Sequence, residues 1–531
     1  MVELTNGSDA LYGDGDELGP NSAWSARPYL TSSDLVAFRI KDGFNADARD
    51  LSRSNGYAKS ALSATISSVI GVALKLQLAP NAAMLGVSPD TAMEWAKMVE
   101  ARWEADAHSP SFCLDAARRR TFAGLMRTAM SIAYVSGETL ASVEWKRSFS
   151  ENGTRTCLNL IAPERLSDPL GMIDYTGVRR MGVDRDKQGA PEAYHIREQH
   201  QSDAGMWGFD QMKWNRVKRF SFWGRPNILH YFEDDQADMT RGISSFSAVA
   251  MQMRMLDDYA RTELESAALR ATYAAVIETE SDWETAMQTI GPEMRASLQA
   301  NGPMELNLKR MASAAQYYRG QDFRYGKSKV AHLLPDEKLH MVQGTQNASA
   351  LKDFTSSNVN QIAAGLSVST ESMTKNFSDT NYSGARASLY NVHRGHMVTR
   401  DGFVSRFGWP FFTAWLEEHI ALRGTIPMLG DRSFYECKDS ISQGSFETWG
   451  KIRLDPLKEV QADQVLYNMG ATTLKDICAS EGYDYEAVLA QRAKEKATMA
   501  KLGLKPEDIN PELIMNQGAQ PKGEAGGGTS Q

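Results

Sequence analysis

The stretch Ser244–Thr272 reads SSFSAVAMQMRMLDDYARTELESAALRAT, and it decides the fold that we expect for this chain. Apolar side chains recur every three or four residues, without glycine or proline, at Phe246, Val249, Met253, Leu256, Ala260, Leu264 and Ala267. This spacing predicts one helix of about 28 residues, which at 1.5 Å per residue is roughly 40 Å long. Charged residues occupy the other faces, so we expect the narrow apolar stripe to pack against a second helix or against copies of itself.

A second helix is expected over residues 347–364, ending at Gly365. The stretch that follows is polar and lacks hydrophobic periodicity until an Ala-rich helix begins near Gly384. The pattern predicts a mobile loop between two rigid helices. The loop contains no recognisable catalytic residues.

The residues before the long helix suggest a mixed α and β domain. Ser88-Pro89-Asp90 predicts a helix start, and the Trp95, Val99 and Trp103 face of that helix should be buried. A second helix is expected near residues 115–135. Strands are expected at 140–145, 156–161, 193–197 and 228–232.

Helices should dominate beyond the loop. We expect one around 409–422, one over 457–469 that stops at Gly470, and one that starts with a capping box at Thr473 and Asp476. Residues 1–30 and the tail from Gln517 are rich in glycine and small residues, so we expect both ends to be flexible.

Composition limits the class of protein. Hydrophobic residues make up 42% and charged residues 23% of 531 residues, which is typical of a globular protein with three to four domains. Neither a membrane-spanning run nor a signal peptide is evident, so we expect folding in the cytoplasm. The four scattered cysteines should be reduced core residues. The net charge of −8 argues against a tight grip on phosphates.

Several apparent catalytic motifs fail on spacing. Gly320–Gly326 followed by Lys327-Ser328 resembles a Walker A loop, but five residues separate the glycines where that loop has four. The pairs His195/His200 and His393/His396 lack the further ligands of a metal site, and structural or surface histidines explain them better. We therefore predict no catalytic residue, no metal and no cofactor.

The segment Lys213–Arg225 interleaves basic and aromatic residues. Such a pattern can form a stacking surface for nucleic acid. We favour the simpler interpretation, an amphipathic strand and turn whose rings pack inside the first domain.

Six short motifs carry a resemblance to a known family. In chain order they are RDLSRSNGYA at 49–58, RRTF at 119–122, APER at 162–165, TRG at 240–242, LD at 256–257 and LKEVQ at 457–461. Together with the loop sequence at 361–390, they resemble the portal proteins of lambda-like tailed phages. The resemblance extends from about residue 20 to residue 500.

The resemblance implies an α+β, helix-rich portal fold that assembles into a ring, usually of twelve subunits, at one capsid vertex of the virion. Carried onto this sequence, it implies a flexible arm (1–28), a wing (29–243), a stem helix (244–272), a clip (273–346), a second stem helix (347–366), a channel loop (367–384), further wing helices (385–453), a crown (454–500) and a flexible tail (501–531). In some relatives the arm is cut by the maturation protease, and no cut can be placed here.

The resemblance also implies site residues and partners. The loop residues that would face the DNA channel are Lys375, Asn376, Ser378, Asp379, Thr380, Asn381 and Tyr382. Stem packing would use Val249, Met253, Leu256, Ala260 and Leu264. The expected partners are further copies of the chain, the terminase large subunit, a head-completion or connector protein, the major capsid and scaffold proteins, and weakly held double-stranded DNA, with no membrane. The alternatives are a P-loop-type packaging ATPase, a nuclease subunit or a generic capsid protein.

Overall fold

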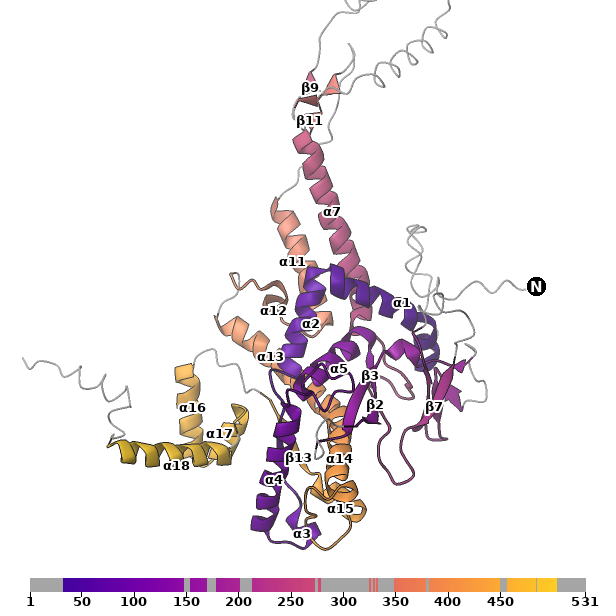
Figure 1. Ribbon diagram of the computed structural model, residues 1–531. Helices are drawn as coiled ribbons and strands as arrows, with labels where there is room; N and C mark the ends of the chain where they lie inside the picture. The colour runs from indigo at the N-terminus through magenta and orange to yellow at the C-terminus, as the bar shows by residue number, and fades with distance from the viewer. Residues whose placement is uncertain are drawn as a thin grey trace, which may run out of the picture.

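The computed structural model describes residues 32–147, 153–169, 178–200, 213–272, 348–378, 382–448, 456–483 and 485–503, together with four two-residue strands between 276 and 332. Figure 1 shows a body of helices and sheets, a pair of helices that rises from it, and a group of C-terminal helices beside it. The described chain is rich in helices and has short, mostly antiparallel sheets, which confirms the α+β class. Both ends expected to be flexible lie almost entirely outside the described residues.

Helices α1 (Ser33–Ser54) and α2 (Gly56–Val69) are separated by one residue, Asn55. The Asn55 backbone is extended, and its N–H donates to Leu51 O at 2.9 Å. Its side-chain oxygen accepts a bond of 2.9 Å from Ala58 N–H. Asn55 therefore ends α1 and caps α2.

Helix α4 (Pro89–Ala107) confirms its predicted start, because Ser88 Oγ accepts from Thr91 N–H at 3.1 Å. Its predicted buried face is also confirmed. Helix α5 (Phe122–Ser136) starts later than the expected residue 115. The Asp115 carboxylate accepts three backbone N–H bonds of 2.9–3.0 Å from residues 117, 119 and 120, so this stretch is a tight turn.

Two antiparallel sheets confirm the predicted strands. The first has the order β3–β2–β8 and consists of β2 (Glu138–Trp145), β3 (Thr156–Ile161) and β8 (Ile228–Phe232). The second has the order β4–β5–β6–β7 and consists of β4 (Arg179–Arg180), β5 (Val183–Arg185), β6 (Pro191–Arg197) and β7 (Trp214–Lys218). The first five residues of β2 are all buried, with α5 packed on the strand, and its last two residues are exposed.

The main core joins α4 and α5 to the helices after residue 400. Trp103 of α4 makes edge-to-face contacts with Phe122, Phe412 and Trp415 at centroid distances of 4.8, 5.2 and 5.1 Å. A short pair, β1 (Lys75–Leu78) with β13 (Gly444–Glu447), closes this core. All four cysteines are free thiols, and three are buried as predicted, whereas Cys478 is only half-buried.

One helical path runs from Tyr382 to Leu422. It consists of α13 (Tyr382–Phe403), a π turn (Val404–Gly408), α14 (Trp409–Glu417) and a second π turn (Glu418–Leu422). The predicted helix over 409–422 is therefore the end of a much longer one. Helix α15 (Phe434–Ile441) follows with a capping box.

The C-terminal helices are α16 (Pro456–Asn468), α17 (Leu474–Ser480) and α18 (Tyr485–Leu502). The predicted stop at Gly470 is confirmed by its φ of +72°, and the capping box is confirmed by reciprocal bonds between Thr473 and Asp476. Helix α16 and the residue after its end leave several apolar side chains exposed: Leu457, Val460, Val465, Leu466 and Met469.

The paired helices are α7 (Ala250–Thr272) and α11 (Ala348–Gly365). A 3-10 turn, Ser245–Ala248, precedes α7, so its regular part starts six residues later than predicted. Between the pair lie β9 (Val276–Ile277), β10 (Arg324–Tyr325), β11 (Ser328–Lys329) and β12 (Ala331–His332). The rest of 273–346, including the Walker-like lysine, lies outside the described residues.

Candidate functional site

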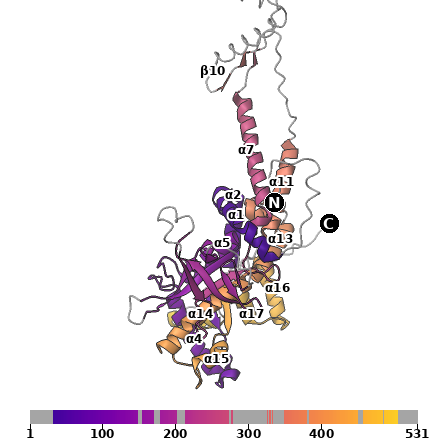
Figure 2. The ribbon, with the colours of Figure 1, turned by 90° about the vertical axis from the view of Figure 1, so that its right-hand side faces the viewer.

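Helices α7 and α11 lie side by side in both views of the molecule (Figures 1 and 2) and form a rod. At the base of this rod, Val249, just before α7, and Met253 and Leu256 of α7 belong to the same buried cluster as Val359 and Ile362 of α11. A methyl group on Gly365 would lie 2.5 Å from Val249 Cγ1, so only glycine permits this approach. The lower halves of the two helices are therefore tightly packed.

Further along the rod, the predicted apolar stripe is exposed. Ala260 is exposed, and Leu264 has 72% of its surface open to solvent. Met251, Met255 and Phe354 are also exposed. The structure thus brings together three of the five predicted packing residues and leaves Ala260 and Leu264 uncovered.

The rod is anchored to α1 and α2 by polar contacts. The Asn55 side-chain amide donates to both carboxylate oxygens of Asp257 at 2.9 Å. Arg254 forms ion pairs with Asp47 at 2.6 Å and with Asp50 at 3.4 Å. Because the Arg254 pairs are exposed, we expect them to fix orientation more than to add stability.

A buried cluster of charges lies where the chain enters the rod. Glu138 accepts bonds from Arg241 Nε at 2.9 and 3.0 Å, and Lys41 and His230 lie 3.3 and 3.1 Å from its carboxylate. Burial alone would raise the pKa of Glu138, but the charges of Arg241 and Lys41 and the bond with His230 hold it well below 4.5. The ionised carboxylate therefore holds α1, β2 and β8 to the chain that leads into α7.

Two glycines allow a close crossing beside this cluster. The backbones of Gly137 and Gly242 approach so closely that a Cβ on either would overlap the other segment. Gly137 has a φ of +78°, which suits glycine. Lys41 donates to the carbonyl of Gly242, which fixes the crossing.

The chain leaves α11 through a tight turn. Ser367 adopts a φ of +55°, and Tyr134 Oη donates to Leu366 O at 2.9 Å. Ser369 then caps a short helix, α12 (Thr370–Thr374), by accepting from Ser372 N–H at 3.1 Å. Met373 of α12 is buried in the cluster at the base of the rod.

Helix α12 corrects the prediction of a loop over residues 367–384. The exposed segment starts only at Lys375, whose φ of +58° ends α12, and α13 begins at Tyr382 rather than near Gly384. The prediction failed because a five-residue helix has too few apolar positions to show a period. We name residues 375–381 the channel segment, after the role that the resemblance implies for this stretch, and they are fewer than the loop predicted over 367–384.

The predicted loop residues fall into two groups. Lys375, Asn376 and Ser378 are exposed, and Asn376 Oδ1 accepts bonds from Ser378 N–H at 3.0 Å and Ser378 Oγ at 2.8 Å. Asp379, Thr380, Asn381 and the Tyr382 side chain lie outside the described residues. Sequence reasoning missed Phe377, which has 55% of its surface exposed although it is aromatic.

The two histidine pairs and the basic segment Lys213–Arg225 differ in how far they are buried. His195 forms a bond of 2.9 Å with Asp184, as expected for a structural histidine. His396 is buried, and burial, then the charge of His393, lowers its pKa from 6.5. The prediction that the rings of Lys213–Arg225 pack inside the first domain is wrong in part, because Phe222 is 96% exposed.

Two negative findings apply to the described part of the chain. No group of three His, Cys, Asp or Glu side chains there is placed to hold a metal ion. No helix within the described ranges is long and apolar enough to span a bilayer.

Comparison with known proteins identifies relatives along most of the chain. Residues 20–400 match the family described as "Phage portal protein, lambda family". The chain is 33% identical to portal protein B of Escherichia phage lambda over 465 residues, which are 87% of this chain and 85% of that protein. It is 32% identical to the portal protein of Escherichia phage N15 over 484 residues, which are 90% of this chain and 88% of that protein.

Solved structures give weaker similarities. The neck of a native gene transfer agent particle matches with a TM-score of 0.41 and 13% identity, covering 86% of this chain and 95% of that one. The neck of an empty particle gives a TM-score of 0.43 and 13% identity, covering 87% and 97%.

Proposed function

Since the chain belongs to the lambda family of phage portal proteins, it is a subunit of the ring that forms the DNA channel at one capsid vertex, and we propose how its parts divide this work. The ring is the passage for packaging and ejection of double-stranded DNA in the virion. We assign the wing to residues 29–243 and 385–453, the stem to the rod, the clip to 273–346 and the crown to 454–500.

Exposed apolar residues support the stem assignment. The base of the rod is packed within one subunit, while Met251, Met255 and Leu264 on α7 and Phe354 on α11 are exposed. Removing an apolar side chain of this size from water is worth about 1.5–3 kcal/mol before the entropy costs of association are subtracted. We propose that stems of neighbouring copies cover these residues, with Ala260 and Leu264 at the contact between copies.

The channel segment is our proposed contact with DNA. The observation that carries this proposal is the exposed polar turn Lys375–Ser378, held at the base of the rod by the buried Met373. Lys375 and Asp379 offset each other in charge, and Asn376, Ser378, Thr380, Asn381 and Tyr382 can make transient contacts with phosphates. We add Phe377, whose exposed ring can touch sugar and base edges.

A weak attraction between the channel wall and DNA suits the passage of a duplex through the ring. A strongly basic bore would hold DNA by releasing counterions, whereas this chain has 58 basic and 66 acidic residues. We propose that acidic and neutral polar side chains line most of the channel, so that the duplex slides. The clip would receive the terminase large subunit and later the connector protein, and the wing would face the capsid and scaffold proteins.

The family is a structural one, so ATP hydrolysis belongs to a partner in our proposal. A P-loop ATPase is the alternative, and the spacing before Gly326 counts against it. An ATPase assay on the purified chain discriminates between the two. Hydrolysis that is abolished by Lys327→Ala would support the enzyme.

Two measurements test the channel proposal. Negatively stained purified protein should show closed rings with a central hole. Assembled rings should bind a short DNA duplex only weakly at low salt, and Lys375→Glu should weaken the binding further. Nanomolar binding that collapses with added salt would contradict a bore through which DNA slides. Lys352→Glu, an exposed lysine on α11, is the matched control.

A further inference from the structure

The crown helices, as we name α16–α18, contribute no described side chain to the buried core of the subunit. Every described residue of these three helices is exposed or half-buried. The three buried apolar clusters of the described chain end at Phe446, before α16 begins. Apolar burial is the main force that holds packed elements together. The crown helices are therefore not fixed to the body by a shared core.

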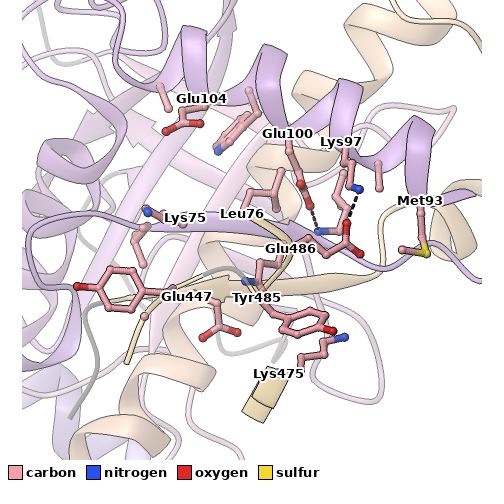
Figure 3. Close-up of a pocket in the computed structure, with 18 of the residues that line it drawn as sticks. Lys75, Leu76, Met93, Lys97, Glu100, Glu104, Glu447, Lys475, Tyr485 and Glu486 are labelled. Carbon is pink, nitrogen blue, oxygen red and sulfur yellow. Dashed lines mark hydrogen bonds and ion pairs between the residues drawn. The ribbon is translucent and has the colours of Figure 1, made fainter. Parts of the chain in front are cut away.

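Two hollows lie where the crown helices meet the body. The first has a volume of about 320 Å³ and lies between α4, β1 and the start of α18 (Figure 3). The second is lined by residues of β1 and β13 on the body and by Lys475 and Asp476 of α17. Protein interiors are normally packed without such voids. The contact between the crown helices and the body is therefore loose.

Two ion pairs join the crown helices to the body beside these hollows. Lys97 of α4 pairs with Glu486 of α18, and Figure 3 marks this contact. Arg386 of α13 lies 3.4 Å from Glu459 of α16. The side chains of Lys97 and Arg386 are 60% and 50% exposed, so water and salt screen both pairs. A pair of this kind changes an equilibrium constant by at most about fivefold.

The three crown helices are joined to one another by short turns. Ala471 N–H donates to Leu466 O at 3.0 Å, which closes the turn between α16 and α17. Tyr483 N–H donates to Cys478 O at 2.8 Å at the end of α17, and α17 contacts α18. We therefore expect the crown helices to move together, so that the two ion pairs act on one unit.

The pair with Arg386 acts on a helix that is itself weakly held. Among the described residues 383–402 of α13, only His396 is buried. Arg386 lies about one turn after Tyr382, where α13 starts directly after the channel segment. Crown helices that are docked on α4 therefore also restrain the start of α13, and crown helices that leave α4 release it.

We propose that the crown helices dock reversibly on α4 through these ion pairs, and that the docked crown helices hold the start of α13 and with it the channel segment. The docking stands on the contacts above, and its effect on DNA passage rests on the role proposed for the channel segment. Because both pairs are exposed, raising the ionic strength shifts the crown helices toward the undocked state.

Spin labels measure the docking. Met98→Cys on α4 and Leu489→Cys on α18 carry one label each, in a Cys478→Ser background that removes the one native thiol not buried. The distance between the labels should be short and narrowly distributed at about 0.1 M salt. A longer component should grow several-fold toward about 1 M salt, where the Debye length falls from about 10 to about 3 Å. Met98→Cys with Val72→Cys is the matched control, because both residues belong to the body.

Charge reversal connects the docking to the ion pair and to the channel segment. Glu486→Lys replaces attraction by repulsion, so it should lower the docking equilibrium constant about fivefold or more. Adding Lys97→Glu should restore most of the docking. Glu495→Lys, the same change at an exposed position of α18, is the matched control. A spin label at Ser378→Cys should gain mobility in Glu486→Lys and not in Glu495→Lys.

The outcomes separate this inference from the proposed function. Distances that ignore both salt and Glu486→Lys overturn the reversible docking. Crown helices that undock without a change at Ser378 overturn the hold on the channel segment. A short distance found only in rings that mix singly labelled subunits means that the crown helices dock on the next copy, which also overturns the proposal. The distances can be measured on single subunits, so absence of rings contradicts the proposed function and not the docking.

Discussion

Replacing Glu138 by Gln tests whether the buried charge cluster holds the body to the rod. The substitution keeps the shape of the side chain and removes its negative charge. Arg241 and Lys41 are then left facing a neutral amide, with side chains at most 6% exposed. Removing one partner of a buried ion pair costs about 3–5 kcal/mol. We expect a loss of that size in the free energy of unfolding.

The assay is thermal and urea unfolding followed by circular dichroism. A loss of 3–5 kcal/mol lowers the unfolding midpoint of a domain of 150–250 residues by roughly 6–20 °C, and we expect a fall toward the lower end of this range because the body is larger. Glu144→Gln is the matched control, because Glu144 lies on the same strand and is exposed, and its effect should stay within about 0.5 kcal/mol.

A second substitution sharpens the test. Adding Lys41→Met to Glu138→Gln removes the ammonium that has lost its counter-ion, but also its bonds to the carbonyls of Ser136 and Gly242, so the double variant should lose less stability than the sum of the two single variants. Equal midpoints for Glu138→Gln and Glu144→Gln would refute the reasoning. So would a double variant less stable than the sum of the two single effects.

Three further predictions concern the rod and the pH dependence. Gly365→Ala should lower the free energy of unfolding by about 1–3 kcal/mol in urea titrations, because the new methyl group would overlap Val249. Gly395→Ala is the control: its methyl group would have no neighbour within 4 Å, so the substitution should be neutral or stabilising. Equal effects of the two substitutions would contradict the packing of Gly365 on Val249. Leu264→Asp should leave the unfolding midpoint unchanged but reduce ring yield in light scattering, whereas a normal yield would argue against a stem contact there. Burial lowers the pKa of His230 from 6.5, and Glu138 opposes this only in part. The unfolded chain therefore binds the proton first, and the stability of the fold should decrease as pH drops below about 6.5. His230→Asn should flatten this pH dependence in unfolding midpoints measured from pH 8 to pH 5, and an unchanged slope would show that other groups cause it.

Much of the fold could be predicted from the sequence because local signals agreed with burial. Strands β2, β3, β6 and β8, the start of α4 and the paired helices were all expected from periodicity and capping residues. Helix α12 was missed because five residues are too few to show a period. The start of α5 was misplaced because the Asp115 carboxylate stabilises a turn.

The segment Glu417-Glu418-His419 shows why some buried residues could not be predicted. Three consecutive polar residues appear solvent-exposed in the sequence, yet all three are buried at the start of the second π turn. Glu417 accepts from Arg225, and Glu418 accepts from Thr156 N–H at 2.7 Å. Their partners are more than 190 residues away in the chain, so no local pattern reveals them.

Helix α12 occupies part of the predicted loop, and the role of the remaining residues in a channel stays a prediction. The polar sequence of this stretch predicted a loop between two helices, and the resemblance to portal proteins implied that this loop faces the channel. Phe377 was missed because an aromatic residue in a polar stretch is expected to be buried. Which side chains face the bore depends on contacts between subunits, and a single sequence does not contain that geometry.

The glycine crossing at Gly137 and Gly242 gives the protein a stiff mechanical joint. Side chains elsewhere can change rotamer and absorb strain, but here two main chains touch with nothing between them. If a motor docks at the far end of the rod, as we propose, we expect a torque applied there to reach the middle strand of the first sheet through this backbone contact. In this arrangement the rod would act as the lever arm, and the backbone contact between Gly137 and Gly242 would be its pivot.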